Sequence, residues 1–471
     1  MLAIVSYIYL ALPLGIFFIS WLRAPYAIIL VGALIVAGIL LYKDLKLRTF
    51  AFPTITFRHF LLLSLVLVWI YFSGAGEFSF QNGDWIKHNA ILSDLTSSEW
   101  PIRYDLVGQE NTFLNYYLGW YMVPATVGKI YQNLHMAFIA QYVWTTFGVL
   151  LSFAWLSNII KKPHWSLYVF FILFATADSL GIILLRNTNL LNFITPLEHW
   201  STHEYSSFTT LLFWVPGQAI GIWIVMGVLF SMYKNNRLQS FPIWIALLMF
   251  WSPFGVIGLM PFITYMVYRA YKQGDVQDKL FVYHTFSAGL LMMFFYLYFD
   301  ANIFRQLHGN EFSGLWLAHS STEWGRFGVF LLSESILPLS LIFVLRSYLD
   351  KHLRSFFYIA LPVLLFLPLY KYGLLNDLVM RASIPALFIV FLCSYTLLSS
   401  KKVRAQHRFL WLALIIYFIL GTITPITEIN RSVQSEPNIG TSYKLLDIGD
   451  EMAIKQYLGR EHSYIGKYVF R

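Results

Sequence analysis

One polar loop near the start of the chain carries residues that could do acid–base chemistry. It begins at the turn signal Asn82-Gly83 and continues into a stretch with helical spacing, with Asp84 near its start. Lys87 and His88 follow at i+3 and i+4, so a helix would place all three side chains on one face. A carboxylate there can accept a proton from a sugar hydroxyl, and the two cations can hold a phosphate. The simpler alternative is that Asp84 caps the helix and the charged face is solvated.

A second charged group lies far along the chain, in a loop between two apolar runs. Arg381 offers a planar fork matched to a phosphate, and Asp377, four residues earlier, could orient it. Lys371 is near in sequence and could contribute to the same phosphate site. The alternative is a simple i,i+4 ion pair at a helix end, worth about 0.3–0.5 kcal/mol.

A third polar segment, 186–210, suits binding of a sugar or of a metal. His199 and His203 are four residues apart, and a helix would place them on one face, where such a pair can bind a divalent metal. The order is not His-Glu-x-x-His, which excludes a zinc protease. The neighbouring aromatic residues also suit sugar stacking, whereas the alternative is a set of polar residues at a membrane interface. The candidate acceptor- or sugar-binding residues are Arg186, Glu198, His199, His203 and Glu204.

Two acids, Asp178 and Glu334, lie inside apolar runs. Acids within a membrane are costly and usually face an interior cavity. We therefore expect both to support or line a site on the same side of the membrane as Asp84.

The composition excludes an ordinary soluble domain. Of the 471 residues, 58% are hydrophobic and only 12% are charged, against about 25% charged in soluble domains. Lipid can accept more apolar surface than one core could bury. The net charge of +9 does not indicate nucleic-acid binding, because the basic residues fall in short clusters between apolar runs. The single cysteine, Cys393, excludes an internal disulfide.

Apolar runs of about 20 residues predict an all-α, polytopic transmembrane helix bundle of about 11–13 membrane helices. The run 241–268 is interrupted by Trp251-Ser252-Pro253-Phe254-Gly255 and is predicted as two shorter helices. The other predicted spans are 2–22, 25–42, 59–75, 136–160, 165–185, 211–233, 280–299, 327–345, 355–370, 383–398 and 409–427.

Lysine and arginine set the expected orientation. Six segments hold 18 basic residues and only four acids, which places them on the cytoplasmic side: 43–58, 161–164, 234–240, 269–279, 346–354 and 401–408. The opposite, outer face then holds loops 76–112, 186–210, 300–326 and 371–382 and the tail. A spanning helix at 113–131 would reverse this alternation, so we predict an amphipathic, interfacial helix there. The predicted units are a membrane domain, 1–427, and a short non-cytoplasmic tail, 428–471.

Two motifs resemble those of GT-C-fold glycosyltransferases, and the helix-and-loop layout of most of the chain is similar. The first motif resembles the first outer loop of that superfamily. It is the run Gly83-Asp84-Trp85-Ile86-Lys87-His88-Asn89-Ala90-Ile91-Leu92, ending near Trp100-Pro101. The second motif, from Phe113 to Pro124, resembles the superfamily's juxtamembrane helix.

The resemblance implies a membrane glycosyltransferase that moves a sugar from a polyprenyl-phosphate donor to a glycan, lipid or protein acceptor. Asp84 would be the base, and the acceptor hydroxyl would attack the anomeric carbon as the lipid phosphate leaves. That phosphate would need a cation, either a divalent metal such as Mg²⁺ or Mn²⁺ or basic side chains, for which Lys87, His88, Lys371 and Arg381 are the candidates. We expect a place in the cytoplasmic (inner) membrane, with the active loops facing the periplasm or exterior, and a role in glycan biosynthesis for the cell envelope.

Two other functions stay open from the sequence. A polymerase or ligase of lipid-linked polysaccharide usually concentrates its basic residues in one large outer loop, whereas here they are spread over four loops and the tail. A transporter or flippase often has duplicated halves with broken helices, but the break at 251–255 has no evident counterpart in the other half. The chain has no P-loop and no sizeable soluble domain, which argues against an ATP-driven pump and a cytoplasmic nucleotide-sugar transferase.

Overall fold

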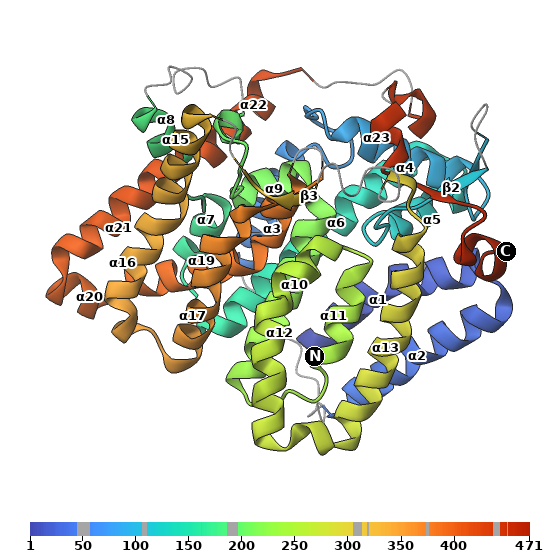
Figure 1. The fold of residues 1–471 in the computed structure, drawn as a ribbon, viewed down its shortest axis with the longest axis horizontal. Coiled ribbons are helices and arrows are strands. Elements are labelled where there is room, and N and C mark those ends of the chain that lie inside the picture. The colour runs from blue at the N-terminus through green and yellow to red at the C-terminus, as the bar shows by residue number, and fades with distance from the viewer. Residues whose placement is uncertain are drawn as a thin grey trace.

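Helices make up most of the protein, as the apolar runs predict (Figure 1). The computed structural model describes residues 1–44, 57–105, 111–161, 163–185, 196–304, 313–317, 320–373, 376–436, 443–449 and 451–471. Within these ranges, eight helical segments are long and apolar enough to cross a membrane. They confirm the prediction of an all-α, multi-pass bundle.

The eight segments include six single helices and two composite ones. The single helices are α1 (Leu2–Trp21), α2 (Ala24–Asp44), α6 (Leu134–Ile160), α10 (Pro216–Lys234), α13 (Lys279–Asp300) and α17 (Lys351–Phe366), the last extended to Leu369. The composite segments are Ser321–Tyr348, which contains α15 (Ser321–Phe330), a π-helical turn (Leu331–Ile336) and α16 (Leu337–Leu345), and Arg408–Gln434, which contains α21 (Arg408–Gly421) and α22 (Ile423–Gln434). Shorter apolar helices are α3 (Phe57–Phe72) and α19 (Ile384–Leu398), and α20 is Lys401–Gln406.

The outer surface of the bundle is strongly apolar. Ile28, Phe57, Phe286 and Phe409 are between 67% and 89% exposed, and they belong to four different helices. A soluble protein rarely leaves so much apolar surface in water. Contact with lipid accounts for it.

Three of the apolar stretches are interrupted. One was predicted to be broken, and two were predicted as single spans. The break in 241–268 is confirmed: α11 (Phe241–Met249) ends, and α12 (Pro253–Gln273) begins at a proline after the capping residue Ser252. The prediction of one helix over 165–185 is wrong, because α7 (Trp165–Ile172) and α8 (Asp178–Leu184) are separated by a non-helical stretch. Likewise α9 (Phe208–Trp214) stops one residue before α10.

The interfacial helix predicted over 113–131 is shorter than expected. Only α5, Met122–Tyr131, is helical, and it packs against α6. Residues Thr112–Leu114 instead form β2, which pairs on one side with β1 (Arg103–Tyr104) and on the other with β5 (Leu458–Arg460). The tail thus supplies hydrogen-bond partners that local sequence could not reveal.

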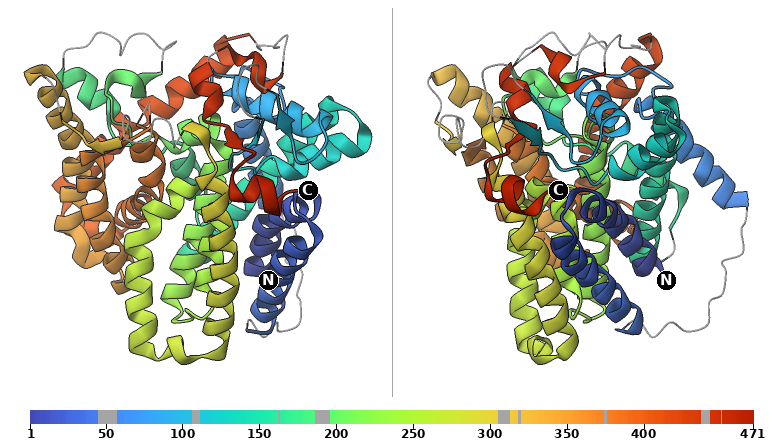
Figure 2. Two further views of the ribbon diagram at one scale, coloured as in Figure 1. Left: turned by 45° about the vertical axis from the view of Figure 1, so that its right-hand side comes forward. Right: turned by 90° about the vertical axis from the view of Figure 1, so that its right-hand side faces the viewer.

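The C-terminal tail packs onto the bundle (Figure 2). Phe470 contacts the rings of Phe17 and Trp21 in α1, and Asp94 of α4 (Trp85–Ser97) accepts a hydrogen bond from the backbone of Leu445 at 3.2 Å. The tail consists of short elements at Leu445–Ile448, Glu451–Lys455 (α23), Leu458–Arg460 (β5) and Ile465–Val469.

The segments assigned to the cytoplasm meet at one end of the bundle. Gln239, after α10, donates to Asp275, after α12, at 2.9 Å. Lys234 at the end of α10 donates to the carbonyl of Ile159 near the end of α6 at 3.2 Å. In Figure 1 the turn between α12 and α13 lies at the bottom, and α4, β2 and α22 lie at the top. The charge pattern therefore separates two ends of the fold.

Candidate functional site

Asp84 lies at the N-terminus of α4, and its carboxylate is turned to Lys87 and does not cap the helix. The residue occupies the N-cap position without a side-chain capping bond. Its Oδ2 accepts the Lys87 ammonium at 2.5 Å. Among the described residues none donates to Oδ1. The predicted helix and shared face are confirmed, and the capping alternative is wrong.

The electrostatics keep Asp84 ionised. Burial alone would raise the pKa of this carboxyl, but the Lys87 ammonium, and further away the Arg381 guanidinium, hold the pKa below its usual value. The side chain is 28% exposed, so a ligand can reach it. Asp84 is therefore an accessible carboxylate with one oxygen available to accept a proton.

His88 does not serve as a cation for a phosphate, contrary to the prediction. It is buried, its Nε2 donates to the carbonyl of Trp214 at 2.9 Å, and its Nδ1 bonds the hydroxyl of Tyr121. Burial, with the Lys87 charge, lowers the pKa of His88 to about 4, so the ring is neutral at pH 7. Its role is to fix α4 against the end of α9.

Arg381 lies in α18 (Asp377–Ala382) and is held from two sides. Its Nη2 pairs with Asp377 at 2.9 Å, and its Nη1 donates to the hydroxyl of Tyr117 at 2.9 Å. Burial opposes the charge, but Asp377 keeps the pKa of Arg381 above its usual value. Asp377 does pair with Arg381 at the i,i+4 spacing, and the Arg381 side chain is buried, because only 7% of it is exposed. Its Nε, also buried, has no partner in the described chain.

The two predicted groups act on each other electrostatically. Asp84 and Arg381 each shift the other's pKa, and the pKa of Tyr117 responds to Arg381, Asp377 and Lys87. We call the set Asp84, Lys87, Asp377, Arg381 and Tyr117 the charged cluster. Two ion pairs from segments far apart in the sequence thus belong to one electrostatic environment.

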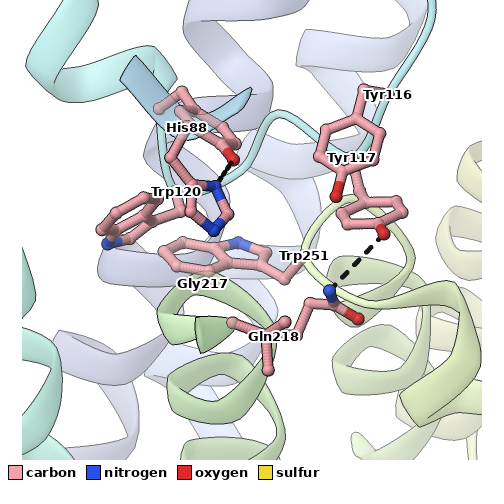
Figure 3. A pocket seen from close by; sticks show the side chains of 9 residues that line it. His88, Tyr116, Tyr117, Trp120, Gly217, Gln218 and Trp251 are labelled. Carbon is pink, nitrogen blue, oxygen red and sulfur yellow. Dashed lines mark hydrogen bonds between the residues drawn. The ribbon is translucent and has the colours of Figure 1, made fainter. Parts of the chain in front are cut away.

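A small cavity of about 10 Å³ is lined in part by Tyr117 of the cluster (Figure 3). That is close to the minimum needed for one water molecule. Gln218 from the start of α10 donates to the Tyr117 hydroxyl at 3.5 Å. The lining residues are His88, Tyr116, Tyr117, Trp120, Tyr121, Val215, Gly217, Gln218 and Trp251. The floor of the cluster is therefore aromatic and tightly packed.

The charge of Asp84 acts on both Glu204 and His199. Burial, followed by the charges of Asp178 and Asp377, raises the pKa of Glu204 to about 8, and the charge of Asp84 contributes as well. No described residue donates a hydrogen bond to Glu204. His199 is an exposed residue, but part of its ring is buried. That burial lowers the pKa of His199, and the charge of Glu428 opposes the shift. Glu204 is thus a protonated, unpaired acid near an ionised one.

Glu198 and His203 are packing residues and do not face the cluster. Glu198 is buried and accepts from the backbone of Ser207 at 2.8 Å, which fixes the start of α9. The helical turn Leu197–Trp200 ends before His203, whose ring packs against Phe327 and Phe330. The idea of a shared helical face for the two histidines is therefore wrong.

The remaining predicted residues have other positions. Lys371 lies in β4 (Tyr370–Tyr372), which pairs with β3 (Ser313–Leu315), and its charge acts on His203. Arg186 lies outside the described residues. Asp178 accepts hydrogen bonds from Trp200 at 3.1 Å and Thr424 at 2.9 Å, which ties α8 to α22.

Glu334 is buried in the π-helical turn (Leu331–Ile336), and its Oε2 accepts a hydrogen bond from Thr176 at 3.2 Å. The Asp178 carboxyl acts on it electrostatically. Both acids support the elements around the cluster without reaching its surface.

Several residues of the site were not foreseen. Glu428 pairs with Arg431 at 2.8 Å and accepts from the indole of Trp214 at 3.1 Å. Tyr457 in the tail packs its ring against Tyr116, with the ring centroids 5.0 Å apart, and its pKa is raised by burial and by the charges of Asp84 and Asp377. The i,i+3 acid–base spacing at 428–431 was a usable signal, whereas nothing local marked Tyr457.

The residues near the cluster fit a divalent metal poorly. Asp84, Asp377 and Glu428 are each paired with a lysine or arginine. In the part of the chain that the structure describes, no group of three or more histidine, cysteine or acidic residues could hold a metal ion. The donors that are present favour an anion held by basic side chains.

The chain matches no protein-family model, and it matches no curated protein.

Proposed function

We propose that this protein is a membrane glycosyltransferase that moves a sugar from a polyprenyl-phosphate donor to an acceptor hydroxyl at the end of the bundle that carries the charged cluster. The observation that supports the proposal is the electrostatic interaction between Asp84 and Arg381. A proton acceptor and a phosphate-binding cation, from segments far apart in sequence, act on each other electrostatically. The positive-inside pattern supports the assignment of this end to the non-cytoplasmic side.

In the proposed reaction, the acceptor oxygen forms a bond to the anomeric carbon as the bond from that carbon to the phosphate oxygen breaks. Asp84 takes the acceptor proton through its free Oδ1. The electron pair of the broken bond stays on the phosphate, whose charge is stabilised by Arg381 and Lys87. No step passes through a metal ion.

Glu204 supplies a second acid in a different protonation state. When the environments of two carboxyls push their pKa values apart, the ionised one can accept a proton and the neutral one can donate a hydrogen bond. Asp84 is held ionised and Glu204 is held neutral. In the proposed site, Glu204 donates a hydrogen bond to a sugar hydroxyl while Asp84 removes the acceptor proton.

A transporter or flippase is the second candidate, and the broken helices favour it. Besides the break at 250–252, the chain is interrupted at 173–177 and at Val215. Transporters often bind substrate at such breaks. Here, however, the charged cluster is held by ion pairs at one end of the bundle. In the break at 173–177, a backbone group is already hydrogen-bonded within the protein, because the Ala177 N–H donates to the Tyr417 hydroxyl.

The test begins with identification of the donor. Mass spectrometry of lipid extracts from cells with and without the protein should show one prenyl-phosphate sugar that accumulates in its absence. That lipid, labelled in the sugar, is then supplied to the purified full chain in lipid nanodiscs together with acceptor membranes. Wild-type protein should transfer the label, and Asp84→Asn should reduce transfer by at least about 100-fold.

Asp350→Asn is the matched control. Asp350 caps α17 through its side chain and is exposed, and asparagine caps a helix equally well. This variant should transfer at the wild-type rate. Full activity of Asp84→Asn, or no change in any glycan when the protein is absent, would refute the proposal. Movement of the labelled lipid across vesicle membranes without transfer would establish the transporter instead.

A further inference from the structure

A second cavity lies at the end of the bundle remote from the charged cluster. Its volume is about 370 Å³, within the usual range for small-ligand pockets of about 300–1,000 Å³. Five helices line it, α1, α2, α6, α10 and α11, together with the loop from α10 to α11. The lining residues are Ala3, Leu41, Asp44, Trp155, Val228, Ser231, Met232, Asn235, Arg237, Ser240 and Trp244.

The cavity has polar groups that the described protein leaves unsatisfied. The indole nitrogen of Trp244 has no hydrogen-bond partner although the residue is fully buried. Ser240 is 2% exposed, and its hydroxyl makes no capping bond at the start of α11. An unpaired buried polar group costs free energy unless a ligand or water meets it.

Two opposite charges lie at the rim. Asp44 ends α2, and Arg237 follows α10. The Arg237 charge acts on the Asp44 carboxyl. Neither makes an ion pair or a hydrogen bond through its side chain within the residues that the structure describes. The acidic Asp278 also acts on Asp44. The rim therefore offers one site for a cationic group and one for an anionic group.

Apart from Ser231 and Asn235, the rest of the wall is apolar. Leu41, Val228 and Met232 line the cavity with the ring of Trp155. The outer face of α2 beside it exposes Ile39 and Tyr42, at 49% and 55%. Asp44 lies at the end of this apolar helix. The end of a spanning helix is where it meets the lipid headgroups.

We infer that this cavity binds a glycerophospholipid whose headgroup carries both a phosphate and a primary ammonium group. Arg237 donates to the phosphate as a planar fork. The ammonium donates to Asp44, and the donors of Trp244 and Ser240 complete the polar contacts. The first methylenes of an acyl chain lie along Leu41, Val228 and Met232. The site is independent of the proposed transfer reaction.

Native mass spectrometry of the purified full chain tests the inference. The delipidated protein is titrated with phosphatidylethanolamine, phosphatidylcholine or phosphatidylglycerol, and bound lipid per chain is counted. Phosphatidylcholine keeps the phosphate but lacks N–H donors, and phosphatidylglycerol keeps the phosphate but lacks the cation. One phosphatidylethanolamine should bind with at least about tenfold higher affinity than either.

The variants separate the two charges. Arg237→Gln should weaken binding of all three lipids by about tenfold or more, whereas Asp44→Asn should remove the preference for phosphatidylethanolamine and keep the phosphate contact. Arg346→Gln is the control, because Arg346 is exposed and bonds the backbone of Phe343 away from the cavity. Equal affinity for the three lipids, or wild-type binding by both variants, would overturn the inference. Each variant's melting temperature should stay at the wild-type value without lipid; Arg237→Lys, which keeps the charge, should bind with an intermediate affinity.

Discussion

Tyr117 accepts a hydrogen bond from Arg381 at 2.9 Å across 264 positions of sequence. The bond joins the loop before α5 to the short helix α18, and Gln218 in α10 bonds the same hydroxyl. One phenol therefore connects three parts of the chain. Its position decides where the guanidinium of Arg381 points.

Replacing Arg381 by lysine should impair the proposed reaction although the charge is kept. An ammonium cannot bond Asp377 and Tyr117 in the planar geometry of the guanidinium while also facing a phosphate. We expect kcat/KM for the donor lipid to fall by about 10- to 100-fold, because a charged hydrogen bond is worth about 1.5–3 kcal/mol. Arg404→Lys at the other end of the bundle, where the side chain only stacks on Trp411, should have no effect. Equal kinetics for the two variants would remove Arg381 from the phosphate site.

Tyr117→Phe should have a smaller effect in the same direction. The ring still fills its place on the aromatic floor, but Arg381 loses one of its two anchors. Loss of this bond, worth about 1.5–2 kcal/mol, should lower kcat/KM by about 10- to 30-fold with little change in melting temperature. Tyr358→Phe is the control, because that tyrosine is 47% exposed on α17. A purely structural role for Tyr117 would lower the melting temperature and leave kcat/KM unchanged.

Gly258→Ala should destabilise the protein at the contact between α12 and α18, the helix that carries Arg381. A Cβ at Gly258 in α12 would lie 2.0 Å from the carbonyl oxygen of Ala382, which ends the helix that carries Arg381. Such backbone overlap costs about 1–3 kcal/mol. Gly289→Ala in α13 is the matched control, since no atom lies within 4 Å of that Cβ; it should stabilise by about 0.5–1 kcal/mol. Thermal unfolding in detergent measures both, and a Gly258→Ala protein as stable as wild type would contradict the packing described above.

Glu204 should make stability depend on pH. Its carboxyl ionises near pH 4.5 in the unfolded chain and at about 8 in the folded protein, so the folded state binds the extra proton between these values. Stability must therefore fall as the pH rises from about 4.5 through 8. Glu204→Gln has no proton to lose, so its melting temperature should fall less than that of wild type between pH 5 and 8. Glu99→Gln, at an exposed acid, should follow the wild-type curve; parallel curves for Glu204→Gln and wild type would mean that Glu204 is ionised in the fold.

Local spacing predicted those parts of the site that lie within one helix. Asp84 with Lys87, and Asp377 with Arg381, are pairs at i,i+3 and i,i+4, and both ion pairs are present. Charge counting between apolar runs predicted that the two pairs share one face. The pattern could not give their direct proximity, which depends on how α4, α10 and α18 pack.

The errors concern residues whose environment is set by distant segments. His88 reads as a cation because Lys87 and Asp84 are its neighbours in sequence, but its nitrogens are taken by Tyr121 and Trp214. Phe113 and Leu114 read as the start of a helix, but they belong to a strand that pairs with β5 from the tail. Neither partner is within reach of a local pattern.

The pairing of β5 with β2 makes this part of the fold a late step in synthesis, because β5 follows all eight of the spanning segments that the structure describes. Tyr457 lies directly before β5, and its ring packs against Tyr116 with the ring centroids 5.0 Å apart. A chain that stalls in translation between α22 and β5 would carry those spanning segments and lack this contact.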